Sequence, residues 1–277
     1  MSHAPARPGP AAPPAAPLQP AHERRFPPAV FWELVGHLAR RQLEAKHQLT
    51  LLGWAWPLTR QLAQLAVLVF VFSAVFNLHI HNYPVFIFIG LIMWTWFSTG
   101  IGDAAWAVTG QRHMILLSRL PKAALPLVSV IVPLVDVLIA FPVLVLMLAL
   151  GDELRWGLLV FLLVLPLQAL LMAGFAWFAA AGSVFFRDVP NIVVLALTLL
   201  FYLTPVFYGL KSVPQKYEWL LEINPLTTII GCQRALLLGD PAPGALRIAV
   251  VTAGSALVAV AGYLWFQRLE PRFADFQ

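Results

Sequence analysis

The segment PVFIFIGLIMWTWFSTGIGDAAWAV (84–108) decides the fold class, because one acidic residue is the only charge in a run long enough to cross a bilayer. The rest of the chain agrees with this segment. Of its 277 residues, 60% are hydrophobic and only 11% are charged, and the mean hydropathy is +0.79. A soluble domain carries about 25% charged residues. The composition therefore excludes a soluble globular protein and predicts an integral membrane protein.

Apolar runs of similar length recur along the chain and predict six membrane-spanning segments. Each span must be helical, because the hydrocarbon core offers the backbone no other hydrogen-bond partner. A lipid-facing β-barrel would alternate polar and apolar residues, and the unbroken runs exclude it. The fold class is therefore an all-α membrane protein. The expected spans are 58–78, 84–108, 125–150, 158–186, 192–208 and 246–266.

The distribution of Lys and Arg predicts the orientation. With six spans both termini lie on one side of the membrane, and that side receives thirteen of the 18 basic residues. The cytoplasmic side of membrane proteins is the one enriched in Lys and Arg. Both termini are therefore expected in the cytoplasm, and the net charge of +5 reflects this bias rather than nucleic-acid binding. The basic residues assigned to the outer side are Arg155, Lys211, Lys216, Arg234 and Arg247.

The N-terminal part changes character twice before the first span. Residues 1–28 are rich in Pro and Ala and predict a disordered tail. In residues 29–49 the apolar side chains fall on one helical face and the charged ones on the other, which predicts an amphipathic helix. Such a helix fits the headgroup plane of the membrane, and packing on a partner protein is the alternative. Residues 50–277 form the membrane domain.

Residues 209–245, between the last two spans, are too apolar for a solvated loop. They are interrupted at Pro214, Asn224–Pro225 and Gly239. This pattern predicts two short helices that dip into the outer leaflet and hinge at Pro225, a geometry tolerated only where protein or a cavity shields the backbone. A seventh span is the alternative, but an odd number of spans would move the C-terminal arginines outside.

No catalytic constellation stands out in the sequence. No glycine is followed by lysine, which excludes a P-loop, and the single Cys232 excludes an internal disulfide. His79 and His81 are close enough to hold a metal, although a solvated turn is the favoured interpretation. Two carboxylates lie within spans, where such groups usually have a function. Asp103 is interpreted as structural, and for Asp136 a structural and a proton-carrying role stay open.

Aromatic residues form 12% of the chain and include ten tryptophans. Packing in lipid or core explains most of them, but aromatic rings also stack on the apolar faces of sugars and can guide a polysaccharide. The candidates for such a pathway are Trp94, Trp96, Phe97, Trp106, Tyr202, Phe207 and Tyr208.

The inner loop QRHMILLSRLPKAALP (111–126) places an apolar patch between basic residues. A short amphipathic helix of this kind can enter a groove of a partner protein, and a plain basic loop is the alternative. A second inner loop carries an Arg-Asp pair. The candidate partner contacts are Gln111, Arg112, His113, Met114, Ile115, Leu116, Leu117, Arg119, Lys122, Arg187 and Asp188.

Seven segments, taken in order, carry a resemblance to a known family. They are LLGWAWPLTRQLAQL (51–65), YPVFIFIGLIMWTWFSTGI (83–101), LPKAALPL (120–127), VFFRDVPNIV (184–193), LTPVFYGLKSVPQKY (203–217), INPLTTIIGCQRALLLGD (223–240) and LEPRFAD (269–275). Together they resemble the transmembrane permease subunit of ABC exporters for bacterial surface polysaccharides, of the O-antigen and teichoic acid type and more distantly of the capsule type. The resemblance covers residues 29–277.

The resemblance implies a homodimer in the bacterial inner membrane, with two copies of a separate ATPase subunit beneath it. Lipid-linked polysaccharide would cross through a channel at the dimer interface, and ATP and Mg²⁺ would bind the partner rather than this chain. The resemblance assigns a coupling helix to 111–122, an interface helix to 29–49 and outer gate helices to 209–239. The gate residues are Tyr217, Trp219, Asn224 and Pro225.

Three other functions stay open from the sequence. A proton-coupled secondary transporter would use Asp136, a membrane enzyme would act on lipid-linked sugar, and an exporter could carry capsular polysaccharide. The chain is expected to catalyse nothing alone.

Overall fold

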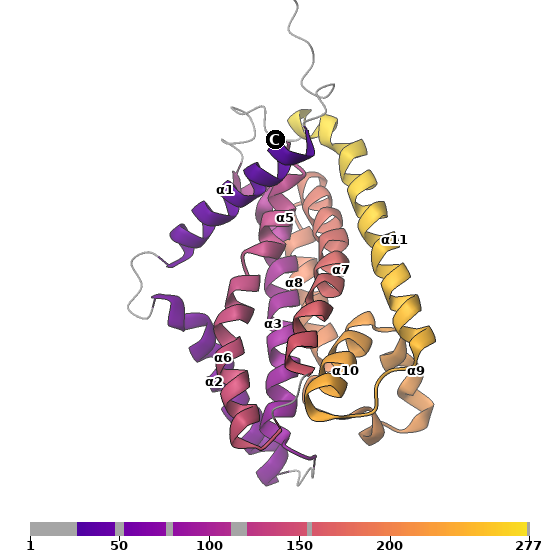
Figure 1. Ribbon diagram of the computed structural model, residues 1–277. Coiled ribbons are helices and arrows are strands. Elements are labelled where there is room, and N and C mark those ends of the chain that lie inside the picture. Colours follow the sequence, from indigo (N-terminus) through magenta and orange to yellow (C-terminus); the bar gives the residue numbers. More distant parts are fainter. Residues whose placement is uncertain (1–26, 48–52, 76–79, 112–120, 154–156, 276–277) are drawn as a thin grey trace, which may run out of the picture.

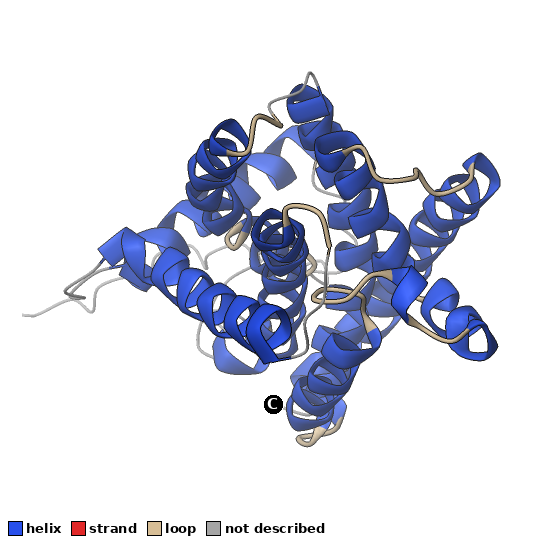
Figure 2. Ribbon diagram, turned by 90° about the horizontal axis from the view of Figure 1, so that it is seen from below, coloured by secondary structure: helices blue, strands red, loops and turns tan. Residues whose placement is uncertain are grey.

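The computed structural model describes residues 27–47, 53–75, 80–111, 121–153 and 157–275, in which the helices form an upright bundle (Figure 1). All regular structure in these residues is helical, which confirms the all-α class (Figure 2). The α-helices are α1 Pro28–His47, α2 Trp56–Val69, α3 Tyr83–Ala107, α5 Ala124–Ile131, α6 Leu134–Leu150, α7 Gly157–Phe185, α8 Val189–Leu203, α9 Gln215–Ile223, α10 Pro225–Leu238 and α11 Ala245–Leu269. Shorter turns of helix are η2 Gly53–Ala55, η3 Phe70–Val75, η4 Thr109–Gln111, η5 Leu210–Ser212 and η6 Glu270–Asp275.

Five helical segments in the described part of the chain are long and apolar enough to cross a membrane. They correspond to the expected first, second, third, fourth and sixth spans, with ends displaced by a few residues. The segments are Gly53–Ser73, Tyr83–Ala107, Ala124–Leu150, Phe161–Phe185 and Ala245–Phe273.

The expected fifth span, 192–208, is shorter in the structure. Its helix α8 has 15 residues, which at 1.5 Å per residue reach about 22 Å across a core of about 30 Å. The helix ends at Leu203 because Thr204 precedes Pro205 and is extended, with φ −99° and ψ 132°. The expected end at Tyr208 is therefore wrong, and the count of six spans stays a prediction.

The third span is divided into two helices. Helix α5 ends at Ile131 and α6 begins at Leu134, since Pro133 between them has no N–H to donate to the preceding turn. The two pieces follow one another along the bundle (Figure 1). The single span expected over 125–150 is therefore interrupted by a turn at Val132–Pro133.

Helix α3 is the central element of the bundle. It packs against α2, α5, α6, α7, α8 and α10, and 78% of its most apolar stretch is buried, against 17% for the peripheral α11. Every residue from Val85 to Trp94 is buried. The half of α3 opposite the C-terminus, which we name the outer half after the predicted orientation, is therefore enclosed by protein on all sides.

Helix α1 has the amphipathic character expected of residues 29–49. Its charged side chains are exposed, and its apolar face packs on α5, where Val35 and Ala39 are buried with Ala124 and Val128. Part of the apolar face therefore packs on another helix of the same chain, while Val30 and Trp32 are exposed. The placement of α1 in the headgroup plane stays a prediction. The Pro/Ala-rich tail lies outside the described residues.

Helices α9 and α10 lie at the end of the bundle opposite the C-terminus (Figure 1). They meet at Asn224, whose side chain caps α10 by accepting a hydrogen bond from the N–H of Leu226 at 3.0 Å, and Pro225 is the first residue of α10. Two short helices with a break at Pro225 are thus present as expected. Their insertion into the outer leaflet stays a prediction.

Candidate functional site

The guanidinium of Arg234 organises the outer end of the bundle. Its side chain extends from α10, is 5% exposed, and donates to the carbonyl oxygens of Phe86, Pro205 and Val206 at 2.7–3.3 Å. Its central carbon also lies 3.4 Å from the centre of the Phe86 ring. One side chain therefore joins α10, the start of α3 and the segment that follows α8.

Two further side chains fix the segment after α8. The Asn224 amide donates to the hydroxyl of Thr204 at 2.8 Å, and the Tyr83 hydroxyl donates to the carbonyl oxygen of Phe207 at 2.7 Å. The backbone of Val206 also lies close to Gly90 of α3, where an added Cβ would come within 2.8 Å of the Val206 oxygen. Motifs from three parts of the sequence thus meet at the outer end of the bundle. We refer to these residues as the outer cluster: Tyr83, Phe86, Gly90, Thr204, Pro205, Val206, Asn224 and Arg234.

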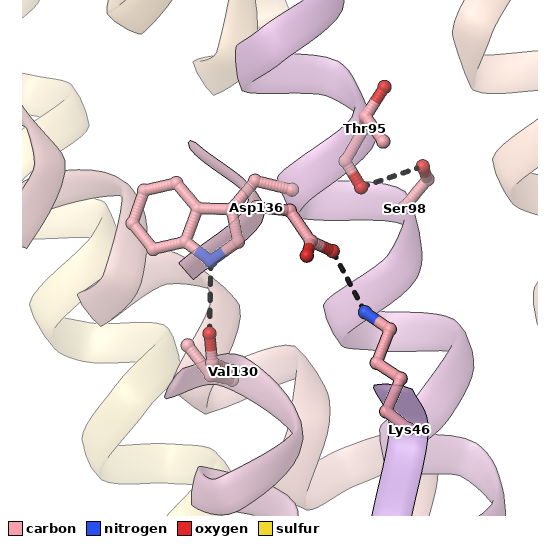
Figure 3. A network of polar contacts seen from close by, with 6 residues as sticks. Lys46, Thr95, Ser98, Val130 and Asp136 are labelled. Atoms are coloured by element: carbon pink, nitrogen blue, oxygen red, sulfur yellow. Dashed lines mark hydrogen bonds and ion pairs between the residues drawn. The ribbon is translucent and has the colours of Figure 1, made fainter. Parts of the chain in front are cut away.

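The aromatic candidates fall into two groups. Trp94, Trp96 and Phe97 are buried between helices, and the indole N–H of Trp96 donates to the carbonyl oxygen of Val130 at 2.9 Å (Figure 3). In this conformation the rings of Trp94 and Trp96 are enclosed by protein, whereas Phe97 borders an apolar cleft. Trp106 and Tyr202 are 55% and 62% exposed.

Phe207 and Tyr208 are half-buried beside the outer cluster. The ring of Phe207 stacks on Phe72 with centroids 4.9 Å apart, and the Tyr208 hydroxyl donates to the backbone oxygen of Tyr202. The expected gate residues Tyr217 and Trp219 are exposed on α9, whereas Asn224 is buried. The structure brings Asn224 into the outer cluster and leaves the α9 aromatics outside it.

An apolar cleft of about 580 Å³ opens between α3, α7, α8 and the α9–α10 junction. Phe97 and Ile101 form its α3 wall, and Leu220 and Ile223 of α9 border its outer end. The amide of Asn224 also lines the cleft, but its hydrogen bonds go to Thr204 and Leu226. The cleft therefore offers contact to hydrocarbon and little to a polar group.

A charged pair connects α1 to the middle of the bundle. The ammonium of Lys46 lies 2.8 Å from a carboxylate oxygen of Asp136, whose side chain is 8% exposed (Figure 3). Asp103 on α3 is close enough to interact electrostatically with both groups. The partner of Asp136 is thus a lysine 90 residues earlier in the chain, which supports a structural role for this carboxylate.

We expect Lys46→Met to lower the free energy of unfolding by about 3 kcal/mol, because it leaves the Asp136 carboxylate buried without a counter-charge. The double variant Lys46→Met/Asp136→Leu should recover most of this loss, since two apolar side chains replace the pair. Heat denaturation of the purified variants measures the stability changes of the single and the double variant. Arg40→Met, which breaks the exposed Arg40–Glu44 pair, is the control, and an equal effect of Lys46→Met would contradict the prediction.

The opposite end of the bundle, where the C-terminus lies, is held by η6. Phe273 is fully buried between α5, α7 and α11, Lys122 lies 5.7 Å above its ring, and Glu270 accepts a hydrogen bond from the Lys122 N–H at 3.2 Å. The indole of Trp177 donates to the Ala123 oxygen at 3.0 Å. This packing fixes the start of α5, directly after the inner loop.

The expected partner contacts are placed only in part. Arg187 and Asp188 are exposed in the turn between α7 and α8, at the same end of the bundle as Lys122 (Figure 1). Gln111 ends η4. Arg112, His113, Met114, Ile115, Leu116, Leu117 and Arg119 lie outside the described residues.

Arg234 and Lys46 are the residues that sequence reasoning missed. The distribution of basic residues places Arg234 on the outer side without a role, yet it is the only charged residue of PLTTIIGCQRALLL (225–238). A single arginine in an apolar helix predicts a buried set of acceptors. No pattern in the sequence indicates the Lys46–Asp136 pair, because the two residues lie 90 positions apart and in different segments.

The helical bundle with its long apolar helices defines a multi-pass α-helical membrane protein. The outer cluster stabilises one end of the bundle, and η6 stabilises the other. The ABC-2 type transporter family matches residues 33–238. The chain belongs to this family. The resemblance found in the sequence is thereby confirmed.

Three relatives extend the match over most of the chain. An O-antigen export system permease protein RfbA of Myxococcus xanthus is 30% identical over 241 residues, covering 86% of this chain and 93% of the relative. Two proteins of the same name from Klebsiella pneumoniae are 26% and 24% identical, and each match covers 88% of this chain and 95% of the relative. The chain is thus similar to permease subunits over nearly their whole length.

Proposed function

We propose that this chain is the permease subunit of an ATP-driven exporter that moves lipid-linked, O-antigen-like polysaccharide across the bacterial inner membrane. The observation that carries the proposal is the match with three O-antigen export permeases over at least 93% of their length. The long apolar helices and the excess of basic residues on the side of the termini support it.

The proposed assembly is a homodimer above two copies of a separate ATPase subunit that binds ATP and Mg²⁺. A surface for a second copy is available on α8, whose apolar side chains are largely exposed although the helix is one of the shorter ones. These side chains are Ile192, Val194, Leu195, Leu199 and Tyr202. Both termini are proposed to lie in the cytoplasm, on the side of the ATPase.

The inner loop between α3 and α5 is proposed to carry movement from the ATPase into the bundle. The loop enters after Gln111 and leaves at Lys122, which η6 holds through Glu270 and Phe273. Arg187 and Asp188 are exposed at the same end. A partner that contacts this end would therefore act directly on the first turn of α5.

The proposed function is tested by deleting the chain in its native strain and staining surface polysaccharide. We expect the long glycan to disappear from the surface and to return with the intact chain supplied from a plasmid. A nucleotide-hydrolysing protein should copurify with the tagged chain from detergent extracts. Loss of capsular glycan in place of O-antigen would assign the alternative cargo, and unchanged surface glycan would refute the proposal.

The quadruple variant Met114→Ala/Ile115→Ala/Leu116→Ala/Leu117→Ala should reduce surface glycan at least about tenfold, because the loop would lose the apolar patch that seats in the ATPase. The ATPase should also fail to copurify. A matched control replaces four exposed residues of α11, Leu246, Val250, Leu257 and Val260, by alanine and should leave both measurements unchanged. Normal export by the loop variant would exclude it as the coupling element.

A proton-coupled transporter that uses Asp136 is the second candidate, and the ion pair with Lys46 weighs against it. The variant Asp136→Asn cannot release a proton at this position. We expect it to export glycan at no less than about half the wild-type rate per folded molecule, since ATP supplies the driving force. Complete loss of export in a normally folded variant would favour proton coupling instead.

A further inference from the structure

The inner half of α3 has one face that is not packed. The outer half is buried on every side from Val85 to Trp94, but beyond this point six residues are partly or fully exposed. They follow one another at intervals of three or four residues, or are adjacent, and therefore form one stripe along the helix. We refer to Thr95, Ser98, Thr99, Gly102, Asp103 and Trp106 as the polar stripe.

The chemistry of the polar stripe differs from that of a lipid-facing surface. Helices α8 and α11 expose mainly Leu, Val and Ile, such as Leu257 at 70% exposure. Their exposed threonines, Thr198 and Thr252, are single and donate to carbonyl oxygens of their own helix at 2.8 Å. The polar stripe instead presents three hydroxyls, a carboxylate, a glycine and an indole. Polar groups inside spans face the bundle interior or a water-filled cavity, because lipid offers them no hydrogen bonds. The polar stripe is therefore expected to border an aqueous space.

The charged pair lies next to the polar stripe and supplies a second observation. Asp103 interacts electrostatically with Lys46 and Asp136, and the close view of the pair includes Thr95 and Ser98 (Figure 3). One carboxylate oxygen of Asp136 is buried and has no hydrogen-bond partner in the described part of the chain. Buried oxygens of this kind normally bind a donor, from protein, water or ligand.

We propose that the polar stripe is the wall along which the sugar chain passes through the inner half of the membrane. The inference rests on the proposed function and names the residues that would contact the cargo. The hydroxyls and Asp103 bind sugar hydroxyls, and the exposed ring of Trp106 stacks on the sugars near the inner end of the span. The other faces of α3 carry the buried rings of Trp94, Trp96 and Phe97, which pack against neighbouring helices and keep α3 in place.

The charges at the polar stripe define the kind of glycan. The two carboxylates of Asp103 and Asp136 and the ammonium of Lys46 leave a net negative charge beside the aqueous space. The low-dielectric walls of such a space focus the field of like charges. A chain rich in phosphate or carboxylate would be disfavoured there. The polar stripe therefore fits a neutral, hydroxyl-rich glycan and not a polyanionic one.

Cysteine labelling tests whether the polar stripe borders water. In a Cys232→Ser background, Thr95→Cys, Thr99→Cys and Gly102→Cys are treated in proteoliposomes with a charged, membrane-impermeant maleimide. We expect labelling about tenfold faster than at two controls, because thiols react as hydrated thiolates. The controls are Ala104→Cys, buried on the same helix, and Leu257→Cys, exposed on α11. Equal labelling rates would overturn the inference.

A plugging variant tests whether glycan uses this path. An added Cβ at Gly102 meets no atom within 4 Å, and the same is true of Gly254 on α11. Gly102→Trp should therefore fold but reduce surface glycan at least about tenfold by narrowing the path, whereas Gly254→Trp should export normally. Trp106→Ala should reduce export and Trp106→Phe should restore it, since the ring face is kept.

The deletion and the plugging variant together distinguish failure of the proposed export function from failure of the polar stripe as the glycan path. If deletion of the whole chain leaves surface glycan unchanged, the proposed function fails. If deletion abolishes surface glycan but Gly102→Trp exports as well as Gly254→Trp, the function stands and the polar stripe is not the path. A polyanionic surface glycan that depends on this chain would overturn the assignment of a neutral cargo.

Discussion

Arg234→Met is expected to destabilise the protein by about 3 kcal/mol or more, because the carbonyl oxygens of Phe86, Pro205 and Val206 lose their donor together. Methionine keeps most of the side-chain volume, so the loss comes from unsatisfied acceptors rather than from a large cavity. Thermal unfolding of the purified protein in detergent measures the effect. The expected result is a lower unfolding temperature together with early release of the segment after α8.

Two variants control for the charge and for the helix position. Arg247→Met removes an arginine that bonds the exposed Glu222 and the Thr228 hydroxyl, and it should change stability by only about 0–1 kcal/mol. Arg234→Lys keeps the charge but cannot reach several carbonyl oxygens in one plane, so it should recover only a minor part of the loss. If Arg234→Met and Arg247→Met melted at the same temperature, the structural role assigned to Arg234 would be excluded.

The contacts of the outer cluster hold α10 but not α9, which favours separate movement of these two helices. Helix α10 is bound through Arg234 to α3 and to the segment after α8, and Asn224 fixes its first turn to Thr204. Helix α9 has mostly exposed side chains and borders the apolar cleft. Any movement at the outer end is therefore expected in α9, with Asn224 as the fixed point.

The helices could be predicted from the sequence because a span needs about 20 apolar residues, and this requirement depends only on local composition. The ends were less predictable where a proline acts. Thr204–Pro205 stops α8 before the expected end, and Pro133 divides the third span. Prolines also lie inside α6 and α7 without ending these helices. The position of a proline in the sequence therefore does not by itself predict where a helix ends.

The direction in which each side chain points was not predictable for α3. In a soluble helix the polar face marks solvent, but in a membrane both lipid and the protein core are apolar. Trp94 and Trp96 therefore carried no signal that they were buried. Thr95, Ser98 and Thr99 did carry one, because hydroxyls and an acid three to four residues apart form a single face.

The contact between α7 and α11 leads to the other large expected effect. Gly174 and Gly262 bring the two helices together so closely that a Cβ added to Gly174 would lie 2.6 Å from the Val258 carbonyl. A Cβ on Gly262 would collide with the backbone of Gly174. Backbone atoms cannot rotate away as a side chain can. Small residues at such crossings allow the dispersion contacts that hold helices together in lipid.

Gly262→Ala is therefore expected to destabilise the protein by about 2 kcal/mol, and Gly262→Leu to prevent recovery of folded protein, because the added atoms force α11 away from α7. Gly254→Ala is the matched control on the same helix. Its added Cβ meets no atom within 4 Å, so it should stabilise α11 by up to about 1 kcal/mol through the higher helix propensity of alanine. One methyl group on the same helix thus changes stability in opposite directions at the two sites. Thermal unfolding of the two variants decides, and a stabilising Gly262→Ala would show that the α7–α11 crossing is looser than the structure has it.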